Sequence, residues 1–549
     1  MRLLDPRGQL TLERVTLAPR LAPDALAAGT VLFYDNLKMD VGHYGALFPR
    51  IRHGLTNRGI ARFIDHRETI RGKSPGGIAA LAQKLADMKP AAAVIALADM
   101  GVSPAMVALT IALEKAGIPT ACLTAQPGSA LAVAHAHYRA GALCLIDLDV
   151  FPASEAGDVE RQADACVERI VTALTQGASH ADSYPIDREA AQDDGHLPVR
   201  HERSGSDAEV YDTFESLHIG DGLPIVAPTP ERFERMREHC PFDVDDVIAS
   251  GIGPSGTPIR VRDALVAAVM AGCRPHYVPI VLTALRALAR PEYGLIQAVT
   301  TTFSGGHFVL ASGPIAQQIG MHGGAGCLGP GFRANATIGR AVNLALLNVC
   351  RPVPGHADLA CLSSPAEFTY CFAEDPRLSP WPTLNAERYD ADTTCVMVLK
   401  AEAPHNVLDI GSTTGAALLE TFIDCCTTLG SNNASNAGPL VLVLNPDHAR
   451  ILARDGYDKR RIRREVHAGA RIPLERIRSR GIVSVAAQDH SQGFQYVTRS
   501  PDDVQVVVAG GQGGHSAVLL PWALYSDAVF EVVRSSEGTP ARSIAHSVA

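Results

Sequence analysis

The sequence has few cysteines and no long apolar run. Its 12 cysteines are scattered over 549 residues, which is too sparse for a disulfide scaffold. No pair has the CxxC spacing of a zinc or redox motif, and the adjacent residues Cys425 and Cys426 are poorly placed for one metal ion. No stretch approaches the ~18 apolar residues of a membrane helix, and the N-terminus lacks the apolar core of a signal peptide. We therefore expect a cytoplasmic protein with reduced thiols, no metal and no membrane partner.

Excess positive charge is also missing. There are 49 Lys and Arg against 58 Asp and Glu, so the formal net charge is −9. This balance argues against a broad surface for nucleic acid or anionic membranes. We interpret the one basic run, residues 459–464, as a solvated helix face. A small anionic substrate remains compatible with the charge, because it needs only local positive groups.

The chain is long enough for about three to four domains at ~150 residues each. Residues 1–175 alternate strand and helix patterns, with a small-aliphatic run at 92–97 that is typical of a strand buried on both faces. This alternation predicts an α/β domain with a Rossmann-like open parallel sheet. Residues 176–208 are rich in polar residues and glycine, and we interpret them as a linker, or alternatively as a long surface excursion of one domain.

Two further regions follow the linker. Residues 209–400 are predicted to form a Gly-rich α/β catalytic region, and residues 401–549 a C-terminal α/β region. Thr229 followed by Pro230 predicts a helix start. Asp221 lies between two glycines, where it is either a general base or a residue that only shapes the turn.

A polar turn follows the apolar run at 92–97. It contains Asp99, then Ser103, which we expect to be the N-cap of a helix that begins at Pro104. Ligands of open α/β sheets bind beyond the carboxyl ends of the strands. Asp99 and Ser103 are therefore candidate substrate-binding residues, although both could serve only to shape the turn and cap the helix.

A Gly-rich loop follows the apolar strand pattern at 504–508. It matches neither a GxGxxG motif nor a Walker loop, so no nucleotide is expected. We predict a strand-to-helix turn whose backbone N–H groups bind an anion or acyl group. The alternative is a tight structural turn. The candidate substrate-binding residues are Gly510, Gly511, Gly513, Gly514, His515 and Ser516.

The densest motif spans residues 301–340, with ten glycines between positions 305 and 339. A loop with so many glycines has a high entropic cost of ordering and is usually kept for function. Ser304, His307 and Cys327 are its candidate nucleophiles and bases.

A helix is expected at residues 336–349, directly after this motif. Asn335 is predicted to be its N-cap. Arg333, and Arg340 two turns further, could hold a carboxylate or phosphate near the helix N-terminus. The alternative is a structural crossover in which Arg333 forms a salt bridge.

No histidine pair has the spacing of a metal site. His135 and His137 fall in a helical pattern, where residues two apart do not share a face. Asp447 and His448 have no spaced partner. We expect neither a metal nor another cofactor.

Three segments of the first region carry a family resemblance. They are Asp35-Asn36-Leu37-Lys38, the turn around Asp99, and residues 114–120. In these segments the region resembles the bacterial UGSC family, which is named for a selenocysteine (or cysteine)-Gly-Ser-Cys motif after this aspartate. Met100-Gly101-Val102-Ser103 occupies those positions here. Both redox atoms are absent, so the redox role that the resemblance implies is not expected.

The remainder resembles a second, poorly characterised bacterial family that is often encoded beside UGSC proteins. The resemblance covers residues ~211–525 and rests on segments 220–224, 331–341, 379–381 and 509–511. It implies no particular reaction. The fusion of two such families suggests that their sheets meet at a shared site.

These patterns together predict an enzyme that acts on a small polar substrate bearing a carboxylate. Our first hypothesis is a lyase, with His307 or Asp221 as proton carrier, the substrate anion on Arg333, and backbone N–H groups of residues 510–514 at the oxyanion. The second is a hydrolase or acyl-transfer enzyme with Cys327 or Ser304 as nucleophile. The third is a small-anion-binding protein without catalysis. The sequence leaves substrate identity and homo-oligomerisation open.

Overall fold

Five parallel strands form the sheet of the N-terminal domain, which comprises residues 15–140 and 142–177. The computed structural model describes these residues together with 2–8, 200–202, 207–250, 253–479, 488–522 and 526–548. The strand order is β3 (Phe63–Arg67), β2 (Val31–Asp35), β4 (Ala92–Ala98), β5 (Thr120–Ala125) and β6 (Leu145–Leu148). The predicted open parallel sheet is confirmed.

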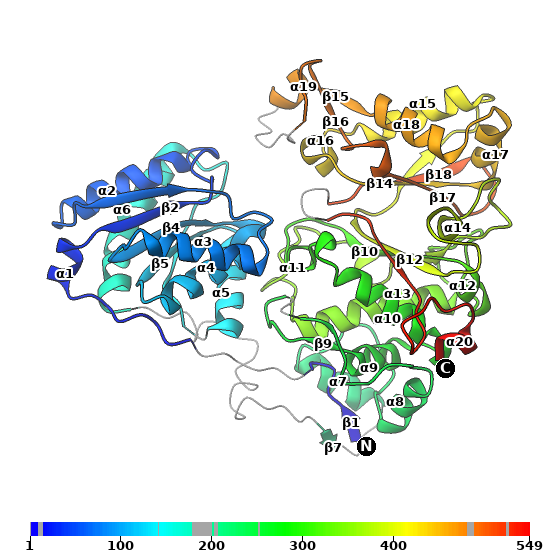
Figure 1. Ribbon diagram of the computed structural model, residues 1–549, viewed down its shortest axis with the longest axis horizontal. Coiled ribbons are helices and arrows are strands. Elements are labelled where there is room, and N and C mark those ends of the chain that lie inside the picture. Colours follow the sequence, from blue (N-terminus) through cyan, green and yellow to red (C-terminus); the bar gives the residue numbers. More distant parts are fainter. Residues whose placement is uncertain are drawn as a thin grey trace.

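Helices cover both faces of this sheet (Figure 1). Val31, Phe33 and Val94 point to one core, which is covered by α1 (Pro23–Ala28), α2 (Leu47–Thr56) and α6 (Ala156–Thr175). Leu32 and Ile95 point to the other, under α3 (Pro75–Asp87), α4 (Ser103–Lys115) and α5 (Gly128–Arg139). Apolar residues at consecutive strand positions therefore serve two cores, because successive side chains face opposite sides of the sheet.

The layered domain contains the rest of the described chain, and its first sheet is mixed. The order is β11 (Cys371–Ala373), β10 (Gly306–Ser312), β12 (Cys395–Ala401) and β19 (Val529–Val532). β11 is parallel to β10, and the other pairs are antiparallel. One face packs on α9 (Val261–Ala271), α10 (Val278–Leu288) and α13 (Arg333–Ala345).

The other face of that sheet packs against a second sheet. Its order is β13 (His405–Leu408), β18 (His515–Leu519), β14 (Leu440–Leu444) and β17 (Val504–Val508). Phe308 and Leu399 share a core with Val443 and Val507 between the two sheets. The outer face is covered by α15 (Gly415–Cys426), α17 (Pro446–Arg454) and α18 (Lys459–Gly469). The layers therefore run helices, sheet, sheet, helices, as the right-hand part of Figure 1 shows.

Shorter elements complete the layered domain. Its helices include α7 (Asp207–Ser216), α8 (Pro230–Arg237), α11 (Leu295–Ala298), α12 (Pro314–Gln318), α14 (Leu384–Arg388), α16 (Asn432–Asn436), α19 (Leu474–Arg478) and α20 (Ile544–Val548). Three two-stranded ladders pair β1 (Arg2–Leu4) with β7 (Arg200–Glu202), β8 (Val247–Ala249) with β9 (Ile259–Arg260), and β15 (Arg471–Pro473) with β16 (Phe494–Tyr496).

Two boundaries differ from the predicted ones. β1 pairs with β7, and Leu3 is buried in the core of the layered domain, so residues 2–4 do not belong with residues 15–177. β19 returns from beyond residue 401 to pair with β12, so the two predicted regions after the linker share one core. Of the predicted linker, residues 178–199 and 203–206 lie outside the described residues, and α7 begins at Asp207.

Three local predictions also need correction. The loop after β17 leads into strand β18 and not into a helix, because residues 515–519 alternate between the two faces of the sheet. The helix predicted at 336–349 begins at Arg333 and ends in a π-helical turn, Leu346–Cys350. Ser103 is the first residue of α4 and makes no capping hydrogen bond. The predicted start of α8, with Thr229 as N-cap, is confirmed.

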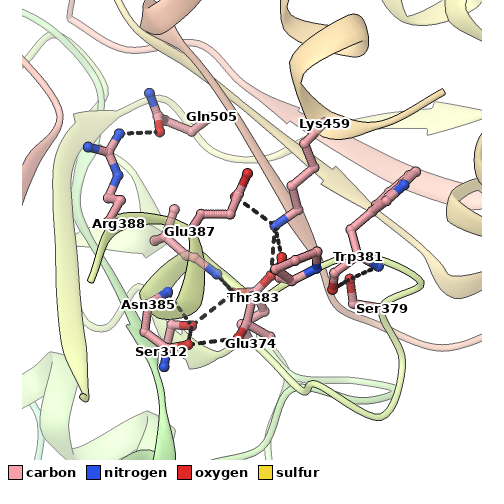
Figure 2. Close-up of polar contacts among 12 residues, drawn as sticks. Ser312, Glu374, Ser379, Trp381, Thr383, Asn385, Glu387, Arg388, Lys459 and Gln505 are labelled. Atoms are coloured by element: carbon pink, nitrogen blue, oxygen red, sulfur yellow. Dashed lines mark hydrogen bonds and ion pairs between the residues drawn. The ribbon is translucent and has the colours of Figure 1, made fainter. Parts of the chain in front are cut away.

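A buried polar network joins the two sheet layers (Figure 2). Lys459 Nζ lies 3.0 Å from Glu387 Oε2, 3.5 Å from Glu374 Oε1 and 2.7 Å from the carbonyl oxygen of Pro382. Glu374 Oε2 also accepts hydrogen bonds from Ser312 Oγ and the N–H of Leu384. Lys459 is therefore not on a solvated helix face as predicted, whereas Arg460 and Arg464 are exposed.

Candidate functional site

A cavity of about 440 Å³ lies at the start of β10 in the layered domain. It brings together His307 and Asp221, which the sequence analysis selected separately, with Lys400 from the end of β12. Its charged and polar lining residues are His218, Asp221, His307, Asn343, Asp358, Ser363, Ser364, Glu367 and Lys400. The volume suits a small molecule.

His307 is held as a neutral imidazole. Its Nδ1 lies 2.5 Å from the hydroxyl of Tyr293, which is fully buried and has no other hydrogen-bond partner among the described residues. Burial raises the pKa of Tyr293 well above its usual value, so the hydroxyl keeps its proton and donates it to Nδ1. Burial and the nearby Lys400 hold the pKa of His307 well below its usual value. The remaining proton therefore sits on Nε2, which can act as a donor, and His307 lines the cavity.

Lys400 lies opposite His307 in the ladder of β10 and β12, so both side chains leave the sheet on the same face. Only 2% of Lys400 is exposed. Its Nζ lies 3.2 Å from Glu367 Oε1, and the second oxygen of Glu367 accepts a hydrogen bond from Ser363. The ammonium group is therefore fixed in place and partly neutralised.

Asp358 is the carboxyl group with the most unusual acidity in the cavity. Burial, and secondly the charge of Glu367, raise the pKa of Asp358 to about 6. The N–H groups of His356, Ala357 and Asp358 all donate to the carbonyl of Val353, which makes a tight turn around it. A carboxylate of raised pKa is a stronger base than an exposed aspartate.

The backbone around the cavity is strained. His218 and Ser363 line it with φ values of 52° and 56°, and Arg351, beside the lining residue Pro352, has φ of 58°. Non-glycine residues in this region are uncommon and cluster at functional sites. The π-helical turn at 346–350, which supplies two more lining residues, is another such feature.

Asp221 lies in the cavity wall but is not free. Its two carboxylate oxygens accept hydrogen bonds of 2.7 and 2.8 Å from Arg340, which lies on α13. One of them also accepts from the N–H of Leu223, 3.2 Å away. This arrangement favours the interpretation of Asp221 as a turn-shaping residue. Arg340, which could hold a substrate anion by the sequence prediction, binds the carboxylate of Asp221 instead.

Neither family models nor curated proteins nor solved structures give a match to this chain. The functional interpretation therefore rests on the geometry of the site. Among the described residues there is no group of three or more His, Cys, Asp or Glu side chains that could hold a metal ion. No described helix is long and apolar enough to cross a membrane.

Arg333 and Asn335 bond to backbone groups of the protein. The guanidinium of Arg333 donates two hydrogen bonds, of 3.0 and 2.8 Å, to the carbonyl of Gly272 at the end of α9. Asn335 lies inside α13 and is not its N-cap. Its side chain accepts from the N–H of His322 and donates to the carbonyls of His322 and Cys327. Asn335 therefore braces the Gly-rich segment by pairing its backbone groups, and Arg333 ties the start of α13 to the end of α9.

The two candidate nucleophiles are not among the lining residues of the His307 cavity. Burial raises the pKa of Cys327 to about 11, so its thiol is protonated at neutral pH and poorly nucleophilic. Ser304 Oγ accepts a hydrogen bond from the N–H of Leu362, 3.2 Å away.

The two Gly-rich loops meet in space, as a bridge between Gly324 and Gly510. Gly510 donates to the carbonyl of Gly323, and Gly513 donates to Asp447 Oδ2. A Cβ on Gly511 would lie 2.8 Å from that of Ala325, so the contact itself requires glycine. These N–H groups are engaged within the protein.

The residues after this loop are engaged as well. Ser516 Oγ lies 2.7 Å from His448 Nδ1 and accepts from the N–H of Asn445. His515 Nδ1 lies 3.0 Å from Asn406 Oδ1. Gly514 is packed so closely that a Cβ there would lie 2.5 Å from Ile410. The segment at 510–516 thus ties β18 to its neighbours.

Sequence reasoning missed four residues of the site: Tyr293, Asp358, Glu367 and Lys400. Lys400 did leave a signal, since it is a single charge that ends the apolar run at 395–399. The other three lie in segments without a periodic pattern.

Proposed function

We propose that the chain is an enzyme that moves a proton at a carbon next to a carbonyl or carboxylate group of a small polar substrate, with bond cleavage of the lyase type as the overall reaction. The observation that carries this proposal is one cavity with two fixed donors, His307 Nε2–H and Lys400 Nζ, and a carboxyl group of raised pKa, Asp358. Such groups in one cavity are typical of enzyme active sites.

The donors would bind the substrate oxygen on which negative charge develops. A neutral imidazole and an ammonium group in a site of low dielectric stabilise that charge more in the transition state than in the ground state. Glu367 holds Lys400, and Tyr293 holds His307, so neither donor needs to reorganise. Asp358 would then accept the proton from carbon, because it is ionised at neutral pH but more basic than an exposed aspartate.

The charges of the lining favour a substrate of low net charge. Lys400 is balanced by Glu367, and Asp221 by Arg340, which leaves Asp358 as the one uncompensated charge among the residues described around the cavity. A monocarboxylate or a neutral carbonyl compound can use Lys400 without strong repulsion. A substrate with several negative charges is disfavoured.

Hydrogen–deuterium exchange tests the first step without knowledge of the full reaction. Small 2-oxo acids and 2-hydroxy acids are incubated with the protein in deuterated buffer, and loss of the signal of the hydrogen next to the carbonyl is followed by NMR. We expect exchange with at least one of these compounds. Asp358→Asn should slow it by about a hundredfold or more, since general base catalysis contributes roughly 10²–10⁴.

A matched control separates this role from a general effect of carboxylates. Glu402 is also partly buried and has a raised pKa, but it does not line the cavity, so Glu402→Gln should leave exchange unchanged. Exchange that survives Asp358→Asn would contradict the proposal. Saturable binding without exchange would favour the hypothesis of a small-anion-binding protein instead.

A further inference from the structure

A second, smaller cavity of about 200 Å³ adjoins the His307 cavity in the layered domain, and we call it the side pocket. Its lining residues lie between Tyr211 and Ile225, and in the π-helical turn and the segment that follows it. The two cavities have a common wall, because six residues line both: His218, Gly220, Gly222, Leu347, Val353 and Pro354. The polar turn of the N-terminal domain, with Asp99 and Ser103, lines neither cavity.

The lining of the side pocket is mainly apolar. Phe214 from α7 and Ile219 after it are buried, and Leu223 and Ile225 continue the same wall. Leu347 closes the side that is shared with the His307 cavity. An apolar pocket of this kind gains free energy when it takes up an apolar group from water.

The polar side chains of the side pocket have other partners or are in water. The hydroxyl of Tyr211 donates to the carbonyl of Gly222 at 2.7 Å. Glu215 and His218 are exposed, so water solvates them. A polar group of a ligand would therefore lose its own hydration in the pocket and gain little in return.

The common wall contains two glycines that leave space beside it. Gly220 and Gly222 have φ values of 96° and 80°, in the left-handed region that favours glycine. Their chain neighbours aside, a Cβ at either position would meet no heavy atom within 4 Å. Asp221, between them, lines only the His307 cavity. The wall thus leaves room for a ligand that extends from one cavity into the other.

This wall is also held in shape before any ligand binds. Besides the carboxylate of Asp221, the guanidinium of Arg340 binds the carbonyls of Leu223 and Pro224, at 3.2 and 3.0 Å. The N–H of Gly220 donates to Asn348 Oδ1 at 2.8 Å. A wall that is already ordered lowers the entropic cost of binding.

We infer that the substrate is a 2-oxo or 2-hydroxy monocarboxylate with an apolar side chain, which lies in the side pocket while the oxygen atoms bind His307 and Lys400. This inference rests on the proposed function, since it assigns the two cavities to the two halves of one substrate. A cavity of about 150 Å³ lined by Leu, Ile and Phe can hold benzene, so the side pocket has room for a branched aliphatic group or a phenyl ring.

A graded series of 2-oxo acids tests the inference on the unmodified, full-length protein. Pyruvate, 2-oxobutanoate, 2-oxopentanoate and 4-methyl-2-oxopentanoate are titrated by calorimetry. We expect the affinity to rise by about tenfold or more over the series, because even one methylene group in an apolar pocket can contribute roughly tenfold. 2-Oxoglutarate has a carboxylate at the end of the same carbon chain as 2-oxopentanoate, and it should bind more weakly than 2-oxopentanoate.

A pair of variants tests the pocket itself. Leu223 lines the side pocket but not the His307 cavity and is 41% exposed, so its replacement should leave the fold intact. Leu223→Ala should reduce the preference for 4-methyl-2-oxopentanoate over pyruvate by about fivefold. Val226→Ala is the matched control, because Val226 is 38% exposed, belongs to the same segment and lines neither cavity. It should keep the preference of the parent.

The outcomes separate this inference from the proposed function. The inference is overturned if no acid binds, if pyruvate binds as tightly as the longer acids, if 2-oxoglutarate binds more tightly than 2-oxopentanoate, or if Leu223→Ala keeps the preference of the parent. Hydrogen–deuterium exchange of pyruvate would leave the proposed function standing in each of these cases except the first. A rising series without exchange of any acid would instead overturn the proposed function and support the side pocket as a binding site for apolar acids.

Discussion

At the scale of the residue, burial changes the chemistry of His307 and Asp358 in opposite directions. Removing a charged group from water disfavours its charged form, so an imidazole becomes harder to protonate and a carboxyl harder to ionise. His307 consequently stays neutral and donates from Nε2, while Asp358 titrates at about 6. On the surface, a histidine titrates at about 6.5 and an aspartate at about 3.9.

Asp358 should lower the stability of the protein as pH rises. Its pKa is 3.8 in the unfolded chain and about 6 in the fold, so the folded state binds more protons between these values and stability decreases with pH across that window. Discounted for partial exposure, the loss is about 1–2 kcal/mol. Asp358→Asn should therefore be more stable than the parent above pH 6 and equal to it near pH 3.5, as measured by urea unfolding. An Asn variant that is less stable at pH 7 would contradict the shifted pKa.

Arg333 should matter for stability and not for binding. Arg333→Lys keeps the charge but loses the fork that holds the carbonyl of Gly272, so we expect a loss of about 1 kcal/mol in the free energy of unfolding. Exchange activity in the His307 cavity should be unchanged, because Arg333 does not line it. Arg340→Lys provides the comparison, since it loosens Asp221 in the cavity wall. Reduced exchange with an unchanged melting temperature in Arg333→Lys would return this residue to the site.

The sequence could indicate His307 but not its partners. A histidine directly after two glycines in a Gly-rich stretch occurs at both His307 and His515, so this pattern suggests His307 as a candidate without distinguishing it from His515. Tyr293, Lys400 and Asp358 come from separate elements, and only strand pairing and the turn at 353–358 bring them together. The roles predicted for Arg333 and Asn335 came from local sequence patterns alone. Such patterns do not reveal that backbone carbonyls close in the fold, those of Gly272 and His322, accept hydrogen bonds from these two side chains.

At the scale of the element, the helix start signals give mixed results: Thr229 is an N-cap as predicted, whereas Ser103 and Asn335 lie within α4 and α13. The start of α8 follows from Thr229 and Pro230. β18 was predicted as a helix start because Gly-rich loops after buried strands often lead into helices in parallel sheets. Here the sheet is mixed. β17 pairs with one edge of β14, and the chain then crosses over so that β18 pairs with the other edge.

The first residue of α18 should make a large contribution to stability. Lys459→Met leaves the buried Glu374 without its cation between the layers (Figure 2), whereas Glu387 keeps Arg463, and breaking such a buried pair costs roughly 3–5 kcal/mol. The double variant Lys459→Met, Glu374→Gln should recover part of this loss, because a neutral amide replaces the unpaired charge. Arg460→Met, at the neighbouring exposed position, should change stability by less than about 0.5 kcal/mol. Chemical denaturation of the four proteins measures these differences.

At the scale of the whole molecule, the two domains have separate cores and small contacts. Leu131, Ala134 and Tyr138 of α5 pack on Ala357, next to Asp358, and Arg139 donates to the carbonyl of Gly253. The N-terminal sheet could be predicted because its strands follow one another with helices between them. The double sheet could not, because β10, β12 and β19 are distant in sequence and pair only after the chain has folded back.

The N-terminal domain is held to the layered domain in two ways, by the continuous chain and by β1, which pairs with β7. Limited proteolysis can test the second connection. The composition of residues 176–208 still predicts a linker, so proteases should cut there first and leave both domains folded. The N-terminal fragment would nevertheless stay attached, because β1 pairs with β7, Leu3 is buried in the layered domain, and the N–H of Leu4 donates to the carbonyl of Pro228. We therefore expect the two fragments to co-elute in size-exclusion chromatography.

Leu3→Asp buries a charge and should release the N-terminal fragment after cleavage, whereas Leu362→Asp, at a leucine that is 90% exposed, should not. Separation of the cleaved parent chain would contradict the role of β1, and resistance of residues 176–208 to proteases would contradict the linker.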